Sequence, residues 1–322
     1  MNDGRAGWSS VAITRHFREL SVAGALFLVL VALTIFAPAF FSPQPLLTLV
    51  TSQVAPTLVV ACGMTLVIVC RQIDISVGSL FAICGVAGAL LLQQGLSIAL
   101  ALPAAILLGA IFGACNGVLV AGLGLPSIVV TLATMVTWRE ALRWLRQGVY
   151  VNIGTQGQWF GLSQAAGQWS IIAVATFLLV VLAFALRHLA AGRFVYAVGT
   201  DAEAARLAGI SPRWVTFLCF VFIGGLTGLA AMMTAVQSPQ VDPTAGGGLE
   251  LRTIAAVVVG GVSISGGRGN LWGVLAGLLL LASINPALTY LGVSAYWEKA
   301  IQGAIILLAV VADGLRSRRR QS

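Results

Sequence analysis

The segment over residues 192–213 carries the most informative polar spacing in this chain, because it is the longest charged interval between two apolar runs. Thr200 suits the N-cap of a helix, and Glu203 stands three residues later, where its carboxylate can bond back to the cap as a capping box. Gly209 supplies a left-handed stop, and a proline follows it. We therefore predict a two-turn helix over residues 201–208, which is too short to be stable alone. It is either a capped turn between two spans or a coupling helix that fits a groove on a separate motor protein.

A second candidate group is Asp74, an acid at the edge of an apolar run, within the sequence RQIDISVGS at residues 71–79. A carboxylate placed before a helix satisfies free N–H groups, so Asp74 either caps the next helix or forms part of an inner gate. The apolar runs otherwise carry hydroxyl and amide groups, which either bond back to their own helices or line an uncharged path for a neutral, hydroxyl-rich solute. The residues predicted to line this pathway or its gate are Asp74, Ser76, Ser79, Asn116, Thr131 and Asn285.

Residue patterns typical of enzymes are absent from the sequence. No glycine loop precedes the only lysine, Lys299, and the glycine-rich run at residues 266–269 links two apolar runs as a turn. The histidines, His16 and His188, have no cysteine or carboxylate pattern around them, and the five cysteines show no CxxC spacing. We therefore expect no catalytic site, no metal site and no cofactor in this chain.

Membrane-spanning helices must position these groups, because 59% of the 322 residues are hydrophobic and the mean hydropathy is +0.98. The net charge of +8 comes from basic residues spread between apolar runs, which indicates membrane topology and not nucleic-acid binding. We predict an all-α polytopic membrane protein with a cytoplasmic segment over 1–18, one transmembrane domain over 19–314 and a basic cytoplasmic tail over 315–322. The ten predicted spans are 20–40, 46–69, 77–92, 97–123, 127–138, 170–189, 214–236, 253–262, 271–291 and 300–312.

Basic residues orient these spans. With the N-terminus in the cytoplasm, thirteen of them fall inside and five outside, as the positive-inside rule requires, and both termini are then cytoplasmic. The largest outside loop is predicted over residues 139–168. An alternative for the first run is a signal peptide cleaved near residues 37–39.

The ten spans divide into two inverted halves of five, about 19–168 and 169–314. The third, fifth and eighth are shorter than the ~20 residues of a full span, so they are either spans whose ends the pattern does not show or broken helices. The third and eighth occupy matching positions, which indicates a substrate route near the midplane. Glycines at four-residue spacing recur in the fourth and ninth spans, where they either reflect this repeat or serve generic helix packing. These glycines are Gly109, Gly113, Gly117, Gly269, Gly273 and Gly277.

Several sequence blocks resemble a known family. They are residues 63–68 (GMTLVI), 73–80 (IDISVGSL), 125–132 (LPSIVVTL), 192–210 and, most distinctively, 243–273. Together they resemble the permease subunits of bacterial ABC importers for monosaccharides, of ribose and rhamnose type. Closely related permeases import autoinducer-2 and are nearly the same in these blocks. Two departures are the Arg71–Gln72 pair, where the family often has glycine, and the poorly matching loop over 139–168.

The resemblance implies partners. A second permease chain, identical or not, would form the translocation path with this one. A cytoplasmic ATPase pair would bind ATP and Mg, and a periplasmic sugar-binding protein would deliver substrate at the bacterial inner membrane. Membrane lipid is a further partner, and nucleic acid is not. The ATPase would dock in part on Thr200, Asp201, Glu203, Ala204, Ala205, Arg206 and Gly209.

We thus expect the membrane subunit of an importer for a neutral monosaccharide, rhamnose- or ribose-like. One alternative is an autoinducer-2 permease of the same family. An alternative of a different class is a stand-alone secondary transporter or facilitator, which would need an essential carboxylate in the membrane, and Asp74 is its candidate.

Overall fold

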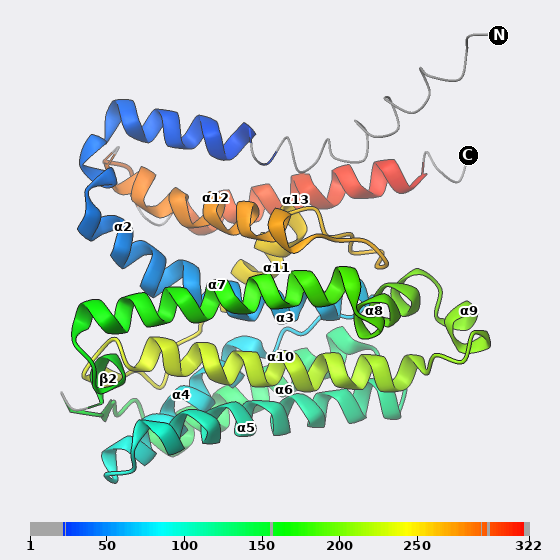
Figure 1. The fold of residues 1–322 in the computed structure, drawn as a ribbon, viewed down its shortest axis with the longest axis horizontal. Coiled ribbons are helices and arrows are strands. Elements are labelled where there is room, and N and C mark those ends of the chain that lie inside the picture. The colour runs from blue at the N-terminus through cyan, green and yellow to red at the C-terminus, as the bar shows by residue number, and fades with distance from the viewer. Residues whose placement is uncertain (1–21, 23, 155–156, 291, 295–296, 319–322) are drawn as a thin grey trace.

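The computed structural model describes residues 22, 24–154, 157–290, 292–294 and 297–318, which form a helical bundle with one short strand pair (Figure 1). The predicted cytoplasmic segment over 1–18 lies outside the described residues, as do the last four residues of the predicted tail. Residues 315–318 continue the last helix, and their assignment to a cytoplasmic tail stays a prediction.

Helices account for most of the described chain, beginning with Gly24–Phe36. In chain order the others are η1 (Pro38–Phe41), α2 (Pro43–Leu49), η2 (Val50–Val54), α3 (Ala55–Val69), α4 (Val77–Gln93), α5 (Ile98–Gly117), η3 (Val118–Gly122), α6 (Ser127–Arg146), η4 (Gln158–Gly161), α7 (Gln164–His188), α8 (Ala190–Thr200), α9 (Ala202–Leu207), α10 (Pro212–Ala235), α11 (Leu249–Val259), α12 (Leu271–Tyr290) and α13 (Trp297–Arg318). The strands β1 (Val151–Asn152) and β2 (Gln240–Val241) pair antiparallel, a small departure from the predicted all-α fold.

Five described helical stretches are long and apolar enough to cross a membrane. They are Pro43–Val69, Ile98–Gly122, Gln164–His188, Pro212–Ala235 and Leu271–Tyr290. The helices Gly24–Phe36 and Val77–Gln93 are apolar but shorter. The protein is therefore a polytopic, helical membrane protein, and the division into ten spans and inverted halves stays a prediction.

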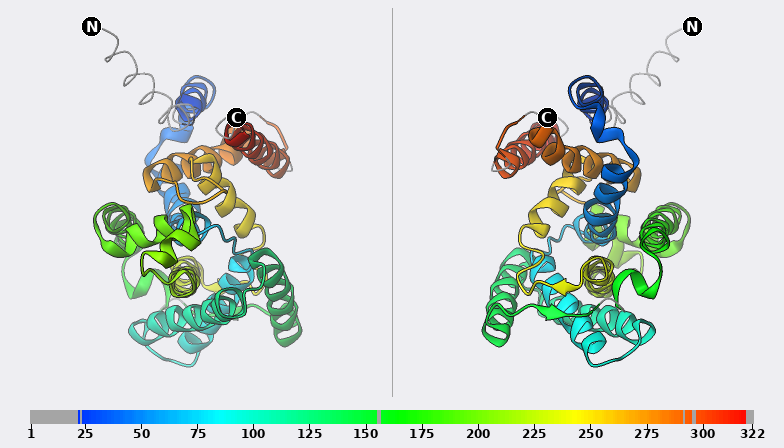
Figure 2. Two further views of the ribbon diagram at one scale, coloured as in Figure 1. Left: turned by 90° about the vertical axis from the view of Figure 1, so that its right-hand side faces the viewer. Right: turned by 90° about the vertical axis from the view of Figure 1, so that its left-hand side faces the viewer.

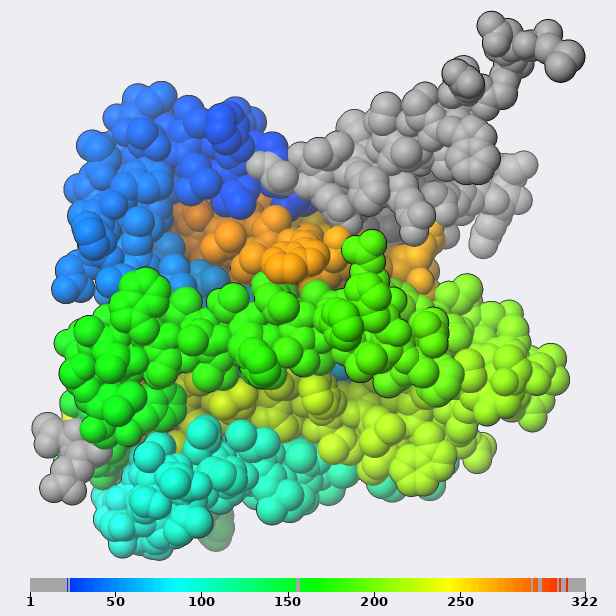
Figure 3. Space-filling model, in the orientation of Figure 1, coloured from blue at the N-terminus to red at the C-terminus, as the bar shows by residue number. Residues whose placement is uncertain are grey.

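The core is built around α3, in which every residue is buried. A helix that is apolar on all sides belongs in the centre of a bundle, where other helices cover each face. By contrast, α7 lies across one face of the molecule (Figure 3) and exposes large apolar side chains such as Phe177, Val181 and Phe184.

Glycines bring α5 and α10 into backbone contact. A methyl group on Gly109 would overlap the carbonyl of Gly224, and one on Gly113 would overlap the carbonyl of Phe220. Side chains at these positions would therefore force the two helices apart. The third glycine of this run, Gly117, faces the ring of Phe217, which is also on α10.

The matching glycines of the second half pack differently. Gly277 faces Ala256 and Gly260, and the carbonyl of Gly273 also lies against Gly260, at the end of α11. Gly269 precedes α12 and faces Val262. In the predicted inverted repeat, α3 in the second span corresponds to α10 in the seventh. The second glycine run would then have to contact α3, but it contacts the end of α11, so the two runs do not make equivalent contacts.

Two predicted short spans, α4 and α11, meet at their N-terminal ends. A methyl group on Gly78 in the first turn of α4 would lie 2.5 Å from the carbonyl oxygen of Gly246, just before α11. With 11 residues, α11 is about 16 Å long and cannot cross a bilayer core of about 30 Å by itself.

Helix α6 extends beyond the predicted fifth span, 127–138, into the predicted loop over residues 139–168. Helix α6 runs for 20 residues to Arg146, so residues 139–146 are helical and not part of a loop. The helix ends where Gln147 and Gly148 adopt positive φ angles of 47° and 78°. Its last two turns carry four charged residues, and this low hydropathy is why the sequence pattern predicts a loop there.

Candidate functional site

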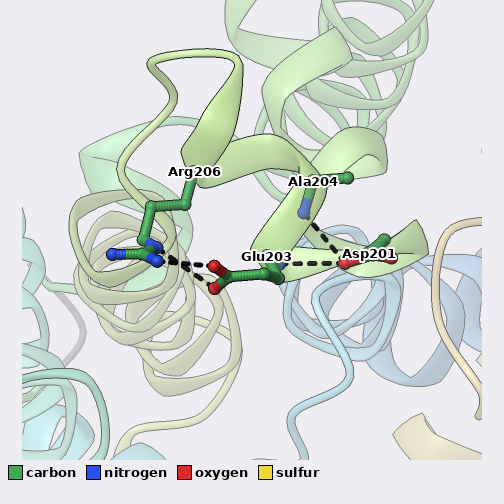
Figure 4. A network of polar contacts seen from close by, with 4 residues as sticks. All are labelled: Asp201, Glu203, Ala204 and Arg206. Atoms are coloured by element: carbon green, nitrogen blue, oxygen red, sulfur yellow. Dashed lines mark hydrogen bonds and ion pairs between the residues drawn. The ribbon is translucent and has the colours of Figure 1, made fainter.

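Helix α9 projects from one end of the bundle, opposite the end that carries β2 (Figure 1). The carboxylate oxygen Oδ1 of Asp201 accepts hydrogen bonds from the N–H groups of Glu203 at 2.9 Å and Ala204 at 3.0 Å (Figure 4). Asp201 is therefore the N-cap, and the predicted cap at Thr200 is wrong by one residue. Thr200 is the last residue of α8, and its hydroxyl donates to the carbonyl of Tyr196 at 2.8 Å.

Glu203 bonds to Arg206 and does not reach back to the cap. Oε2 of Glu203 accepts from Nε of Arg206 at 3.1 Å, and both side chains are about two-thirds exposed. The two charges of α9 therefore neutralise each other on its surface. The predicted stop at Gly209 is confirmed, with φ at 82° and the N–H of Ile210 bonded to the carbonyl of Ala205 at 2.9 Å.

Leu207 is the functional candidate that the sequence reasoning missed. Its side chain is 79% exposed at the end of α9, whereas Ala205 faces the bundle and is buried. Leu207 stands four residues after Glu203 and so shares a face with it. An apolar side chain held in the open on a short, firmly capped helix suits contact with another protein. The sequence did contain a signal for it: Leu207 is the one large apolar residue in the short, alanine-rich helix α9.

We expect the cap of α9 to fail in acid. The N–H groups of Ala204 and Glu203, and to a lesser extent the nearby Arg71, hold the pKa of Asp201 below its ordinary value. A depressed carboxyl pKa contributes stability above the ordinary pKa of about 3.9, and this stability is lost as the pH falls through the lower folded value. Hydrogen exchange at Glu203 and Ala204 should therefore accelerate below about pH 4, beyond its intrinsic pH dependence. The uncharged cap in Asp201→Asn should abolish that acceleration, and an equal acceleration in this variant would contradict the assignment.

The second candidate site surrounds the stretch between α3 and α4. Asp74 is fully buried, and its Oδ1 accepts from the N–H of Ser76 at 2.9 Å and from the Ser76 hydroxyl at 2.6 Å. The side-chain amide of Asn116 on α5 donates to the same hydroxyl at 2.8 Å. Among the described residues, Oδ2 of Asp74 and Oδ1 of Asn116 have no hydrogen-bond partner. Asp74 thus organises the turn before α4 and does not cap the helix directly.

Helix α6 holds the other side of this stretch. The N–H of Ile73 donates to Oγ of Ser127 at 3.2 Å, and the hydroxyl of Thr131 donates to the carbonyl of Ile73 at 3.2 Å. Ser79 only bonds back to the carbonyl of Ser76, at 2.8 Å. Five predicted pathway residues therefore gather here: Asp74, Ser76, Ser79, Asn116 and Thr131.

The sixth predicted pathway residue, Asn285, lies in a separate cluster. Its amide donates to Oε2 of Glu298 at 2.5 Å, and Gln302 donates to Oε1 of the same carboxylate at 2.9 Å. Arg252 on α11 forms an ion pair with Glu298 at 3.5 Å. The sequence reasoning missed Glu298 and Arg252, because both were assigned to connections outside the spans.

The opposite side of α11 also carries charge. Arg139 on α6 donates to the carbonyls of Ala245 at 2.9 Å and of Thr244 at 3.3 Å, in the stretch before α11. Glu250 in the first turn of α11 and the Arg139 guanidinium both lie beside Gly78. Seen end-on, α11 lies between α6 and α13 (Figure 2). The prediction of an interior without charge therefore does not hold around α11.

We expect Ser76→Ala to destabilise the fold more than Ser79→Ala. The first change removes a donor from the buried Asp74 carboxylate and leaves the Asn116 amide without its acceptor, which should cost about 1–3 kcal/mol. The second removes only a bond within one turn and serves as the control. Thermal unfolding in detergent measures both, and equal midpoints would show that the network contributes little.

Comparison with known proteins identifies the family. Residues 46–310 match the family described as the permease component of branched-chain amino acid transport systems. The chain is 34% identical over 294 residues to the ribose import permease protein RbsC of Escherichia coli (strain K12), covering 90% of this chain and 91% of that protein. It is 36% identical over 293 residues to the autoinducer 2 import system permease protein LsrC of Enterobacter sp. (strain 638), covering 90% of this chain and 84% of that protein.

A third relative is the probable ABC transporter permease protein y4mJ of Sinorhizobium fredii (strain NBRC 101917 / NGR234), at 33% identity over 310 residues that cover 96% of this chain and 92% of that protein. No solved structure matches the chain. The exposed capped helix, the long apolar spans and these similarities lead to one conclusion: the chain belongs to the family of ABC importer permeases that includes the ribose and autoinducer 2 import permeases.

Proposed function

We propose that this chain is the membrane subunit of an importer that moves a neutral monosaccharide, ribose- or rhamnose-like, across the bacterial inner membrane. A separate cytoplasmic ATPase pair hydrolyses ATP, a periplasmic binding protein delivers the sugar, and two permease chains enclose the path. Both termini and α9 face the cytoplasm. The observation that carries the proposal is α9, a capped helix that projects from the bundle with an exposed leucine.

The surface of α9 suits docking on a protein groove. Its charged pair, Glu203 and Arg206, is internally neutralised, so little charge has to be desolvated when the helix is covered. Leu207 offers an apolar anchor, and interfaces of this kind concentrate their binding energy in such anchors. The Asp201 cap keeps the short helix formed before contact, which lowers the entropy cost of docking.

The side of the bundle formed by α6, α11 and α13 is the best candidate for the translocation path. In α6, Glu140 and Arg143 are more than half exposed, and exposed charge is costly against lipid but not against water. Helix α7 exposes apolar side chains instead and suits lipid. Helices α6 and α13 lie on the same side of the bundle (Figure 2), so a second permease chain facing them would enclose Glu140, Arg143 and Glu298 in a water-filled path.

The substrate follows from the chemistry of the interior only as a class. Hydroxyl, amide and paired charged groups around Asp74 and Glu298 suit a neutral polyhydroxy solute. The similarity to a ribose import permease supports the same class of substrate. An autoinducer 2 permease is the alternative within the family.

One observation favours a second class of function, a stand-alone facilitator. Asp74 is a fully buried carboxylate whose Oδ2 has no hydrogen-bond partner among the described residues, and proton- or ion-coupled carriers commonly use a buried carboxylate to carry the coupling ion. The same carboxylate is engaged by Ser76 through its other oxygen, which suits a structural role. Uptake without ATP separates the two functions.

The test is purification from native membranes in mild detergent, with the co-purifying proteins identified by mass spectrometry. We expect an ATP-binding protein to co-purify. Glu203→Arg should reduce its recovery, because α9 then carries two positive charges one turn apart, and these must be desolvated without a neutralising partner when the helix is covered. Glu140→Arg makes the same charge reversal in an exposed pair at the other end of the bundle, and it should leave the recovery of the ATPase unchanged even if it alters import. Recovery of the chain alone, with uptake retained in ATP-free vesicles, would support the facilitator.

A further inference from the structure

Arg71 occupies a strained position at the end of α3. Its φ angle is 61°, in the left-handed region that residues with a Cβ disfavour. The side chain nevertheless makes a defined contact, because its Nη2 donates to the carbonyl of Thr200 at 2.6 Å. Thr200 ends α8, and the next residue is the N-cap of α9. Arg71 therefore bonds to the residue that immediately precedes the proposed docking helix.

The surrounding backbone is closely packed. The N–H of Gly267 donates to the carbonyl of Val69 at 2.9 Å, and Gly199 lies directly against the same carbonyl. The hydroxyl of Tyr196 on α8 donates to the carbonyl of Gly269 at 2.8 Å. The end of α3, the end of α8 and the turn before α12 are thus joined at the base of α9.

The chain on the other side of Arg71 leads directly to the second candidate site, the cluster around Asp74. Two residues later, Ile73 bonds to α6 through Ser127 and Thr131. The following turn bonds to α5 through Ser76 and Asn116. A displacement of α9 that pulls on the Arg71 side chain therefore acts on residues 72–76, which are held by α5 and α6.

We propose that Arg71 is a positioning residue that transmits movement of α9 to α4, α5 and α6. The inference rests on the proposed function, because it requires a motor protein that moves α9. The guanidinium contact is made by a side chain, so it can be removed without breaking the backbone bonds around Val69. It joins two segments that are 129 residues apart in the sequence.

The strained backbone provides a discriminating test. Arg71→Gly removes the contact but relieves the left-handed conformation, so the fold should be at least as stable as before. Arg71→Lys keeps a cationic donor that can reach the same carbonyl. Arg193→Ala is the matched control, since Arg193 is an exposed arginine on α8.

The measurement uses the whole transporter, purified with its ATPase and binding protein and reconstituted in liposomes. The readouts are sugar imported per ATP hydrolysed and the thermal unfolding midpoint. In Arg71→Gly we expect import per ATP to fall about tenfold, within the 5–150-fold typical of coupling between sites, with no fall in the midpoint. Import per ATP in Arg71→Lys should stay within about threefold of the wild-type value, below the range typical of lost coupling. Import per ATP in Arg193→Ala should match the wild type.

Wild-type import per ATP in Arg71→Gly, or an equal loss in Arg71→Lys, would overturn the role of Arg71 while leaving the proposed function intact. The wild type is measured first. If it imports sugar without any ATPase subunit, both proposals fail together.

Discussion

Leu207→Asp is expected to abolish import while leaving the permease folded. Leu207 is 79% exposed at the end of α9, so its replacement removes almost no packing within this chain. If the side chain becomes buried in a groove of the ATPase, its loss removes about 1.5–3 kcal/mol of apolar burial. The new carboxylate must also be desolvated, so the ATPase should bind at least about tenfold more weakly, the equivalent of 1.4 kcal/mol.

The measurement is the amount of ATPase that co-purifies with the variant, together with import and thermal stability. Leu207→Met is the control, because it keeps an apolar side chain of similar volume. An unchanged unfolding midpoint would establish that the loss arises at the docking surface. Normal import by Leu207→Asp would show that α9 does not use this side chain for docking.

Gly113→Ala is expected to destabilise the fold strongly. The added methyl group would overlap the backbone carbonyl of Phe220 on α10, and backbone cannot rotate away as a side chain can. Overpacking of this kind costs about 1–3 kcal/mol, and here it would separate the two helices along their shared glycine contact. We expect a lower unfolding midpoint and a lower yield of monodisperse protein in detergent.

Gly122→Ala is the matched control on the same helical stretch. Gly122 meets only a side-chain carbon of Val118 at 3.8 Å, so a methyl group fits there. Replacing a helical glycine that has space around it stabilises by about 0.4–1 kcal/mol, through the unfolded state. Equal midpoints for the two variants would contradict the close contact between α5 and α10.

Helix α9 illustrates how far local sequence signals reach. The charged interval, the capping residues and Gly209 predicted a short helix in the correct place, because each signal acts within one or two turns. The cap was misplaced by one residue because Thr200 and Asp201 both suit that position. Helix α8 continues through Thr200 and ends there, which leaves Asp201 with the extended backbone of a cap.

Helix α6 illustrates where hydropathy fails. Averaged over a window, residues 139–146 are too charged for a span and indicate a loop. In the structure Arg139 donates to carbonyls that lie about a hundred residues later, so the environment of this charge is protein and not lipid. Asn285 was selected for its residue type, and its actual partner Glu298 was assigned to a connection.

The sequence by itself determined the class of protein, the existence of α9 with its stop at Gly209, and the short α4 and α11. These features depend only on composition and on residues within a few turns of one another. Only the tertiary structure decided that Arg71 bonds to Thr200, that Arg139 holds the stretch before α11, and that Glu298 pairs with Arg252. These partners are set by how the helices pack, and packing depends on the shape of many side chains at once.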